Sequence, residues 1–394
     1  MPFLKRRSGL DRNCRKERFC FSGSLLVFGA CFAGFLLGFE DSGLQYILLK
    51  AAQEFHLSQA EMGSLVSIQF SAVTIAPLFM GAVSDRIGKK KVAVFFSMIF
   101  CLGAAVCVFS RSVAALGVGI CGIGAAFSTL ESTMTAAISD AYPRKSGTYI
   151  SIMQGVLSLG AVVSPLTVST LMSGGQIGWR GMFLMCSLIA FSLFLLLLFV
   201  RFPHKLPAKS DECGSMMLKD KLLIGVLAGI FLYVFLENGV AYFLDSFFSE
   251  VLKSGDDSAI ALSGFWTAMA VSRLLVSPLG AFKTKIVPIC FLASAVFLFL
   301  LGTAESQSLA VIWSIASGFF FGPIWPFLVS MANQKYPRHT GMVTSFVLTV
   351  GGIGGVLSPV LAGTAADLAT LSVAFIGLGC AALAGFFLAK ILDK

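Results

Sequence analysis

Long apolar runs separated by short polar breaks make up most of this chain. Twelve runs can be drawn, at roughly 21–48, 62–83, 92–110, 113–138, 148–172, 181–202, 222–247, 259–281, 286–303, 308–332, 341–364 and 370–390. Each is close to the ~20 residues that a helix needs to cross the apolar core of a bilayer. Backbone groups in lipid must be hydrogen-bonded within helices or closed barrels, so unbroken runs of this length predict helices. The pattern therefore predicts an all-α membrane protein with twelve transmembrane helices.

The longest polar break falls between the sixth and seventh runs. It reads "RFPHKLPAKSDECGSMMLKDK" over residues 201–221, with two prolines and mixed charge. We interpret residues 203–221 as a linker between an N-terminal six-helix bundle (21–202) and a C-terminal one (222–394). Residues 1–20 then form an N-terminal tail.

The two predicted bundles share a repeated stretch. "YPRKSGTYISIMQGVLSLGAVVSP" (142–165) aligns without a gap with "YPRHTGMVTSFVLTVGGIGGVLSP" (336–359). The coinciding residues include Tyr142/Tyr336, Gly147/Gly341, Ser151/Ser345, Gly160/Gly354, Val162/Val356, Ser164/Ser358 and Pro165/Pro359. The match predicts two pseudo-symmetric halves. Parallel six-helix repeats are typical of transporters whose halves rock around a central site.

Composition supports a chain dissolved in lipid. The chain of 394 residues is 57% hydrophobic and 12% charged, whereas soluble domains carry roughly a quarter charged residues. Its ten cysteines show no metal or redox spacing, and we find no nucleophile elbow or nucleotide-binding loop. We therefore expect no metal site, no cofactor and no enzyme activity, and we expect a monomer.

The distribution of basic residues predicts the topology. Of the 29 Lys and Arg residues, 24 fall in breaks on the side that holds both termini, and four fall on the other side. Cytoplasmic loops carry such an excess, so both termini are expected in the cytoplasm, with the chain multi-pass in the cytoplasmic (inner) membrane. The net charge of +9 thus indicates orientation in a bilayer and gives no reason to expect a nucleic-acid partner.

A charged stretch, "GAVSDRIGKKKV" (81–92), separates the second and third runs. Its form G-x-x-x-D-R-x-G-K-K-K resembles the signature loop of the major facilitator superfamily. The resemblance implies the fold of that superfamily, with two six-helix bundles, and a cytoplasmic gate that includes Gly81, Asp85, Arg86, Gly88 and Lys89. The second half reads "LGAFKTKIV" at the matching place, with basic residues only, so we expect the latch to be asymmetric.

Ionisable residues within apolar runs are candidates for the transport mechanism. Placing an ionisable residue in the bilayer core costs roughly 2.5–3.5 kcal/mol on insertion scales, so each such residue is a functional candidate. All three His lie in breaks, so proton coupling would run on carboxylates, and we select Glu131, Asp41 and Glu237. An acid could instead pair with Arg273, and Glu40 and Asp41 could lie solvated at the outer interface.

Polar and aromatic residues in the same runs are candidates for substrate contact. The proposed substrate-binding set is Gln45, Gln154, Asn238, Arg273 and Trp325. Amide side chains offer both donors and acceptors, which suit hydroxyl-rich solutes, and a Trp ring can stack on a sugar face. The alternatives are a lipid-interface position for Trp and helix–helix contact for Gln.

Several of these residues resemble the fucose–proton symporter group. They are Glu131 with Gln154, Glu237 after "YV", Arg273, and "FGPIWPFLVSMA" (321–332). The resemblance implies that Glu131 takes the proton and that Gln154 contacts a sugar. The helix-one Asp of that group would fall near Gln45, where this chain departs from the pattern.

The expected function is proton-coupled symport of a small polar solute, such as a sugar, by alternating access. The alternative is a proton-coupled antiporter for drugs or metabolites. Such antiporters usually carry a fifth helix that ends in Gly-Pro, whereas this chain has Ser164 before Pro165.

Overall fold

All regular structure in the described part of the chain is helical. The computed structural model describes residues 4–142, 146–173, 178–203, 220–276, 282–336 and 340–392, and for 4–23 the backbone alone. The elements are α1 (Leu4–Phe55), α2 (Gln59–Ile87), α3 (Lys89–Phe109), α4 (Val113–Ala141), α5 (Ser146–Ser173), α6 (Arg180–Phe199), α8 (Lys221–Ser246), the π-helical turn η1 (Phe247–Val251), α9 (Gly255–Val276), α10 (Lys283–Gly302), α11 (Gln307–Phe321), α12 (Ile324–Lys335), α13 (Thr340–Leu368) and α14 (Leu371–Leu392). Within the described ranges, eleven helical segments are long and apolar enough to span a membrane. With α2, which has 29 residues, they confirm the predicted twelve-helix membrane fold.

The junction between α2 and α3 is shorter than the sequence predicted. We expected a charged loop, but α2 continues to Ile87 and α3 begins at Lys89, which leaves Gly88 as the whole connection. Gly88 has φ +97°, a backbone conformation that glycine adopts without a Cβ clash. Asp85 and Arg86 therefore belong to the last turn of a helix.

The tenth apolar run is broken rather than continuous. α11 ends at Phe321 and α12 starts at Ile324, with Gly322 and Pro323 between them. Proline has no N–H to donate to the preceding turn, so it favours a break at this point. Pro77, Pro165, Pro288 and Pro359 nevertheless lie inside continuous helices, so proline alone does not predict where a helix ends.

The two halves, α1–α6 and α8–α14, repeat the same packing. α1 lies along α5 as α8 lies along α13, and α3 lies along α6 as α10 lies along α14. A Cβ on Gly160 would come within 2.4 Å of the Phe35 carbonyl oxygen, and one on Gly354 within 2.6 Å of that of Phe231. The predicted pseudo-symmetry is therefore present. The linker lies almost wholly outside the described residues, so the domain limits stay a prediction.

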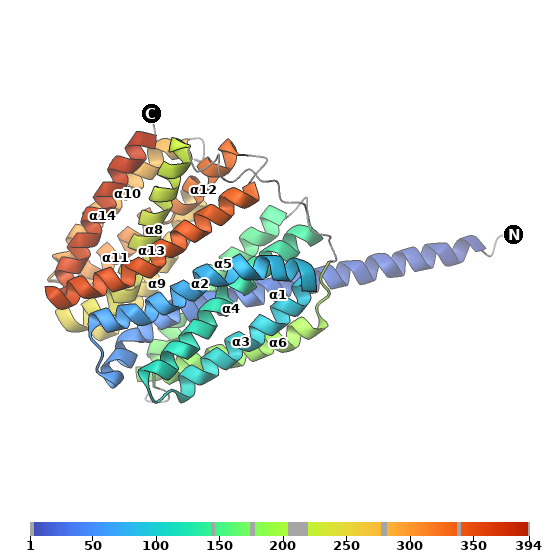
Figure 1. Ribbon diagram of the computed structural model, residues 1–394, viewed down its shortest axis with the longest axis horizontal. Helices are drawn as coiled ribbons and strands as arrows, with labels where there is room; N and C mark the ends of the chain where they lie inside the picture. Colours follow the sequence, from blue (N-terminus) through green and yellow to red (C-terminus); the bar gives the residue numbers. More distant parts are fainter. Residues whose placement is uncertain are drawn as a thin grey trace.

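The halves meet along two helix pairs, α2 with α13 and α5 with α9 (Figure 1). Four glycines let α13 approach a helix on either side: Gly351 and Gly354 face α8, whereas Gly352 and Gly355 face α2. Small residues of this kind allow close contact between membrane helices.

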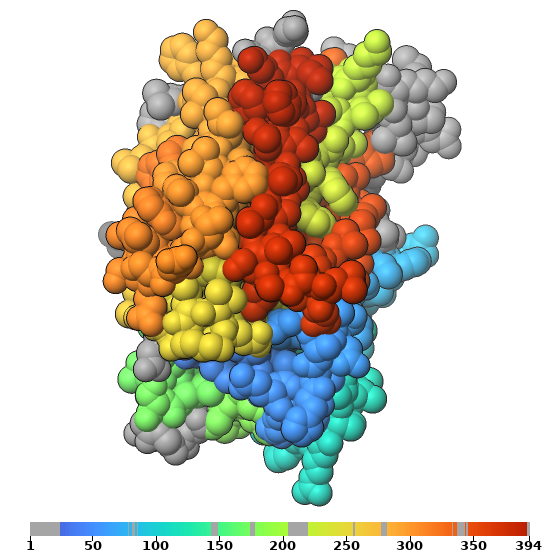
Figure 2. All heavy atoms as spheres, turned by 90° about the vertical axis from the view of Figure 1, so that its left-hand side faces the viewer, coloured from blue at the N-terminus to red at the C-terminus, as the bar shows by residue number. Residues whose placement is uncertain are grey.

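Hydrogen bonds between the halves are concentrated toward one end of the bundle. We call it the closed end: it carries the turn 56–58 between α1 and α2 and the turn 252–254 after η1. Viewed onto this end, α9 and α13 abut α1 and α2 (Figure 2). The opposite end, which we call the basic end, carries Gly88 and the start of α8. Within the described residues, no hydrogen bond joins the two halves there.

Candidate functional site

Asp41 and Glu237 occupy equivalent positions in the two halves. The repeated contacts of Phe35 with Gly160 and of Phe231 with Gly354 align "FLLGFEDSGLQY" (35–46) with "FLYVFLENGVAY" (231–242). In this alignment Asp41 matches Glu237. The sequence analysis selected both acids separately and missed their relation, although the repeat was present as a signal.

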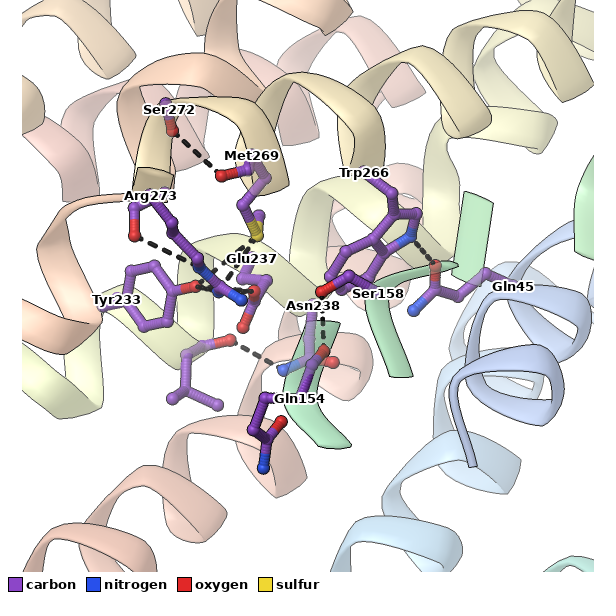
Figure 3. A network of polar contacts seen from close by, with 12 residues as sticks. Gln45, Gln154, Ser158, Tyr233, Glu237, Asn238, Trp266, Met269, Ser272 and Arg273 are labelled. Carbon is purple, nitrogen blue, oxygen red and sulfur yellow. Dashed lines mark hydrogen bonds and ion pairs between the residues drawn. The ribbon is translucent and has the colours of Figure 1, made fainter. Parts of the chain in front are cut away.

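Glu237 belongs to a three-residue network in the C-terminal half (Figure 3). The Tyr233 hydroxyl donates to Glu237 Oε1 at 2.6 Å, and Arg273 Nη2 donates to the Tyr233 hydroxyl oxygen at 3.1 Å. Arg273 Nη2 lies 3.9 Å from Glu237 Oε1. Tyr233 thus lies between acid and base, and the sequence analysis missed it. Its spacing of four residues before Glu237 puts both on one helix face and could have indicated it.

The N-terminal half supplies two further buried acids. Gln154 Nε2 donates to Glu131 Oε1 at 2.9 Å, which joins α5 to α4. Gln69 Nε2 donates to both carboxyl oxygens of Glu40, at 3.2 Å each. Glu40 is 0% exposed, so the alternative that it lies solvated at the outer interface is wrong.

Two hydrogen bonds at mid-helix depth connect the halves. The Tyr242 hydroxyl donates to Asp41 Oδ1 at 3.2 Å, and Trp266 Nε1 donates to Gln45 Oε1 at 3.0 Å. Asp41 therefore faces the other half, and it is partly exposed there.

The remaining predicted substrate residues lie beside the same network. Asn238 follows Glu237, and its Nδ2 donates to the Val234 carbonyl oxygen at 2.9 Å. The Trp325 ring packs against the Tyr233 ring with centroids 5.9 Å apart. Trp325 therefore packs within the C-terminal half rather than standing alone in a lipid-interface belt.

The gate residues lie at the basic end. Lys89 pairs with Asp140 near the end of α4, and Arg86 is exposed. For Gly81 and Asp85 the structure describes the backbone alone, so the predicted role of the Asp85 side chain lies outside what it describes.

A matching lysine contact is present in the second half. Lys283, in the first turn of α10, donates to Gln334 in the last turn of α12, and Asp140 and Gln334 each stand two residues before the repeated Tyr142 and Tyr336. The lysine contact is thus present in both halves, but its partner is a carboxylate in the first half and a neutral amide in the second. The asymmetry expected for the Asp85 and Arg86 part of the latch stays a prediction.

At the same end, Asp220 caps the start of α8 by accepting from the Leu222 N–H at 3.0 Å. Hydrogen bonds from Lys335 and Tyr336 hold the pKa of the Asp220 carboxyl below its usual range. Among the described residues, no three His, Cys, Asp or Glu side chains are grouped so that they could hold a metal ion.

Comparison with known proteins identifies the family. The model of the Major Facilitator Superfamily matches residues 30–280 and 226–393. The chain is 25% identical over 359 residues to the multidrug efflux protein YfmO of Bacillus subtilis, covering 88% of this chain and 87% of that protein. It is 25% identical over 363 residues to the inner membrane transport protein YdiN of Escherichia coli, covering 86% and 83%.

Solved structures share the fold. The nucleoside transporter NupG superimposes with a TM-score of 0.77 at 14% identity, covering 94% of this chain and 100% of that chain. The human organic anion transporter MFSD10 superimposes with a TM-score of 0.68 at 19% identity, covering 93% and 99%. With the family model matching most of the chain, we conclude that this multi-pass membrane protein is a transporter, not an enzyme, and belongs to the Major Facilitator Superfamily.

Proposed function

We propose that this transporter carries out proton-coupled symport of a small polar solute across the cytoplasmic membrane by alternating access. Sugars are the solute class that the sequence favours. One observation carries the proposal: acids from both halves lie at the surface where the halves meet. Asp41 bonds to Tyr242 across that surface, and Glu237 bonds to Tyr233 beside Arg273.

The pattern of contacts between halves supports alternating access. The described hydrogen bonds between the halves run from mid-helix depth, at Asp41–Tyr242, to the closed end, where Lys50 pairs with Asp245. The positive-inside rule predicts that the basic end and both termini lie in the cytoplasm, and we assign this arrangement to an inward-facing state. The relative YdiN, named an inner membrane transport protein, supports the same location.

We assign proton coupling to Glu131, Asp41 and Glu237, with Glu131 as the first choice. A carboxyl group in a membrane interior can bind and release a proton when its surroundings change between states. Substrate contacts are assigned to Gln45, Gln154, Asn238, Arg273 and Trp325, in a monomer with no nucleic-acid partner.

Reconstituted transport tests this proposal. Proteoliposomes given an inward proton gradient and a panel of sugars and other small polar solutes should accumulate at least one of them. Glu131→Gln should abolish accumulation, because a carboxamide cannot exchange a proton. Glu305→Gln, which changes an exposed acid at a loop, is the matched control. Accumulation that is unchanged in Glu131→Gln would refute the role of Glu131.

A drug antiporter is the second candidate function. It is favoured by the likeness to YfmO, whose name describes multidrug efflux. Loading the same vesicles with a cationic dye distinguishes the two functions. Proton-driven dye export without solute uptake would favour the antiporter.

A further inference from the structure

The Arg273 guanidinium has hydrogen-bonding capacity that the protein does not use. Nε donates to the Gly322 carbonyl oxygen at 3.2 Å, and Nη2 donates to Tyr233 at 3.1 Å and to Met269 Sδ at 3.2 Å. Among the described residues, Nη1 has no hydrogen-bond partner. The side chain is 35% exposed, although it lies within a membrane-spanning helix. A guanidinium offers five N–H donors, so one edge remains available to a ligand.

The charge of Arg273 is balanced by Glu237 near the upper limit of ion-pair distance. Glu237 Oε1 lies 3.9 Å from Nη2, and it takes its short hydrogen bond, 2.6 Å, from Tyr233 instead. The titratable groups that face this position are Tyr233 and Glu237 of α8 and, from the other half, Asp41 of α1, which lies within electrostatic reach of Glu237 and of Glu131 in α4. Arg273 is the cation of this group, and ionised Glu237 already balances its charge. An anionic ligand beside Arg273 would therefore add an excess negative charge unless a proton bound at the same time.

The neighbouring amides present acceptors. Asn238 uses its Nδ2 on the Val234 carbonyl, and Gln154 uses its Nε2 on Glu131. Their side-chain carbonyl oxygens have no hydrogen-bond partner among the described residues. Asn238 directly follows Glu237 in α8, and Figure 3 draws both amides in one view with Arg273 and Glu237. A ligand with hydroxyl donors fits these oxygens, and a carboxylate fits the free edge of Arg273.

We propose that the solute is a small hydroxylated carboxylic acid, bound as its anion through Arg273, and that Glu237 takes up one proton with each anion. This inference rests on the proposed function above and narrows its substrate. When Glu237 is protonated, Arg273 is free to pair with the ligand. With the anion bound and Glu237 protonated, the site carries the same total charge as it does without ligand and with Glu237 ionised. A monoanion and one proton therefore cross together without net charge movement.

Matched pairs of solutes test the carboxylate directly. The probes are gluconate against glucitol, glucuronate against glucose, and lactate against 1,2-propanediol, each pair differing chiefly at the acid group. In a thermal-shift assay of the detergent-solubilised full chain, we expect at least one acid, and not its neutral partner, to stabilise the protein. Arg273→Gln should weaken that binding about 10- to 100-fold, as expected for loss of a charge-assisted contact. The affinity of Arg273→Lys for the acid should lie between those of the wild type and Arg273→Gln, since lysine keeps the charge but lacks the planar fork of a guanidinium. Arg180→Gln, which breaks the peripheral pair with Glu54, should bind as the wild type does.

Vesicle measurements test the proton. Uptake of the acid selected by the binding assay should follow an inward proton gradient and should be unchanged by a potassium–valinomycin potential. The Glu237→Gln variant should still bind the acid and exchange it across the membrane, and its binding should no longer vary with pH. It should fail to accumulate the acid under a proton gradient.

The outcomes separate the two proposals. If a proton gradient drives accumulation of neutral solutes as well as acids, or if no acid in the panel stabilises the protein, the carboxylate inference is overturned while symport stands. If acids bind but no solute accumulates under a proton gradient, the proposed function fails. If Arg273→Gln does not fold, two measurements on the wild-type chain still test the carboxylate inference. They are the comparison of each acid with its neutral partner and the response of uptake to membrane potential.

Discussion

Glu40 is enclosed on all sides, yet the described residues give it no cation. It is 0% exposed, and its carboxyl oxygens accept from a single amide nitrogen, that of Gln69. A buried carboxylate without a partner costs far more than a buried amide. We therefore expect Glu40→Gln to keep or raise the thermal midpoint and to leave transport close to that of the wild type, whereas Glu40→Ala should lose about 1–3 kcal/mol by leaving Gln69 unpaired.

The same substitution at Glu237, Glu237→Gln, is the comparison for this prediction. Glu237 faces Arg273 and Tyr233, so Glu237→Gln should end proton-driven accumulation while Glu40→Gln preserves it. Differential scanning fluorimetry and vesicle uptake measure the two effects. Loss of accumulation in Glu40→Gln would show that Glu40 carries a proton during transport, contrary to this prediction.

At the residue scale, sequence reasoning identified the ionisable residues but not all their partners. Arg273 and Glu237 could be selected because charges are rare in apolar runs. Tyr233 was missed, although its spacing of four residues before Glu237 places both on one face of α8. Its contact with Arg273 forms only when α8 and α9 pack together. Lys50 is one of the four basic residues on the side away from the termini, and its ion pair with Asp245 forms only when the two halves associate.

Glycines set how closely α13 approaches α2 and α8, and they divide into two groups. A Cβ on Gly63 would lie 2.1 Å from the Pro359 carbonyl oxygen in the other half. A Cβ on Gly354 would lie 2.6 Å from the Phe231 carbonyl oxygen in the same half. Gly63→Ala should therefore hinder closure between the halves, and Gly354→Ala should strain the C-terminal half itself. Overpacking of this kind costs about 1–3 kcal/mol.

We expect Gly63→Ala to slow uptake about 5- to 100-fold with little change in the thermal midpoint, and Gly354→Ala to lower the midpoint. The uptake assay uses the solute selected by the binding screen. Gly155→Ala and Gly377→Ala are matched controls, because a Cβ at either position meets nothing within 4 Å. Full uptake in Gly63→Ala would show that this contact is not part of the transport cycle.

At the element scale, apolar run length predicted every membrane helix, but not how the helices end. The Gly322–Pro323 pair is a sequence signal for the break between α11 and α12, yet Pro77, Pro165, Pro288 and Pro359 lie inside continuous helices. At this break the Gly322 carbonyl oxygen accepts a hydrogen bond from Arg273 of α9, and Pro326, four residues later, has no N–H to donate to it. The Arg273 contact comes from another helix, so local propensity alone cannot distinguish Pro323 from the others.

The whole molecule combines a symmetric scaffold with unequal chemistry. Asp41 and Glu237 are equivalent by the repeat, but Asp41 bonds across to the other half and Glu237 bonds within its own. In the proposed rocking motion the Asp41 bond would break when the halves separate at the closed end, whereas the Glu237 bond would persist. This difference gives the two acids distinct surroundings in each state, which a coupling mechanism requires.

The closed end is held by a polar contact that tests the rocking motion as a whole. Lys50 Nζ lies 2.9 and 2.7 Å from the two carboxyl oxygens of Asp245, which also accepts from Ser258. The Asp245 side chain is 2% exposed and that of Lys50 is 24% exposed. Removing one partner of a pair that is partly shielded from water should cost on the order of 2 kcal/mol. Asp245→Asn should therefore shift the population toward the state that opens at this end by roughly 30-fold.

Hydrogen–deuterium exchange in nanodiscs measures that shift without a substrate. In Asp245→Asn, exchange should rise in peptides covering 46–62 and 240–250 and fall at the basic end, in 134–142 and 330–336. Glu54→Gln is the matched control, because the Glu54–Arg180 pair lies at the same end but within one half. Adding Lys50→Gln should partly reverse the effect, since it removes the unpaired charge that Asp245→Asn leaves behind. Equal exchange changes in Asp245→Asn and Glu54→Gln would mean that breaking any ion pair loosens this end, and that Lys50–Asp245 does not hold the halves together.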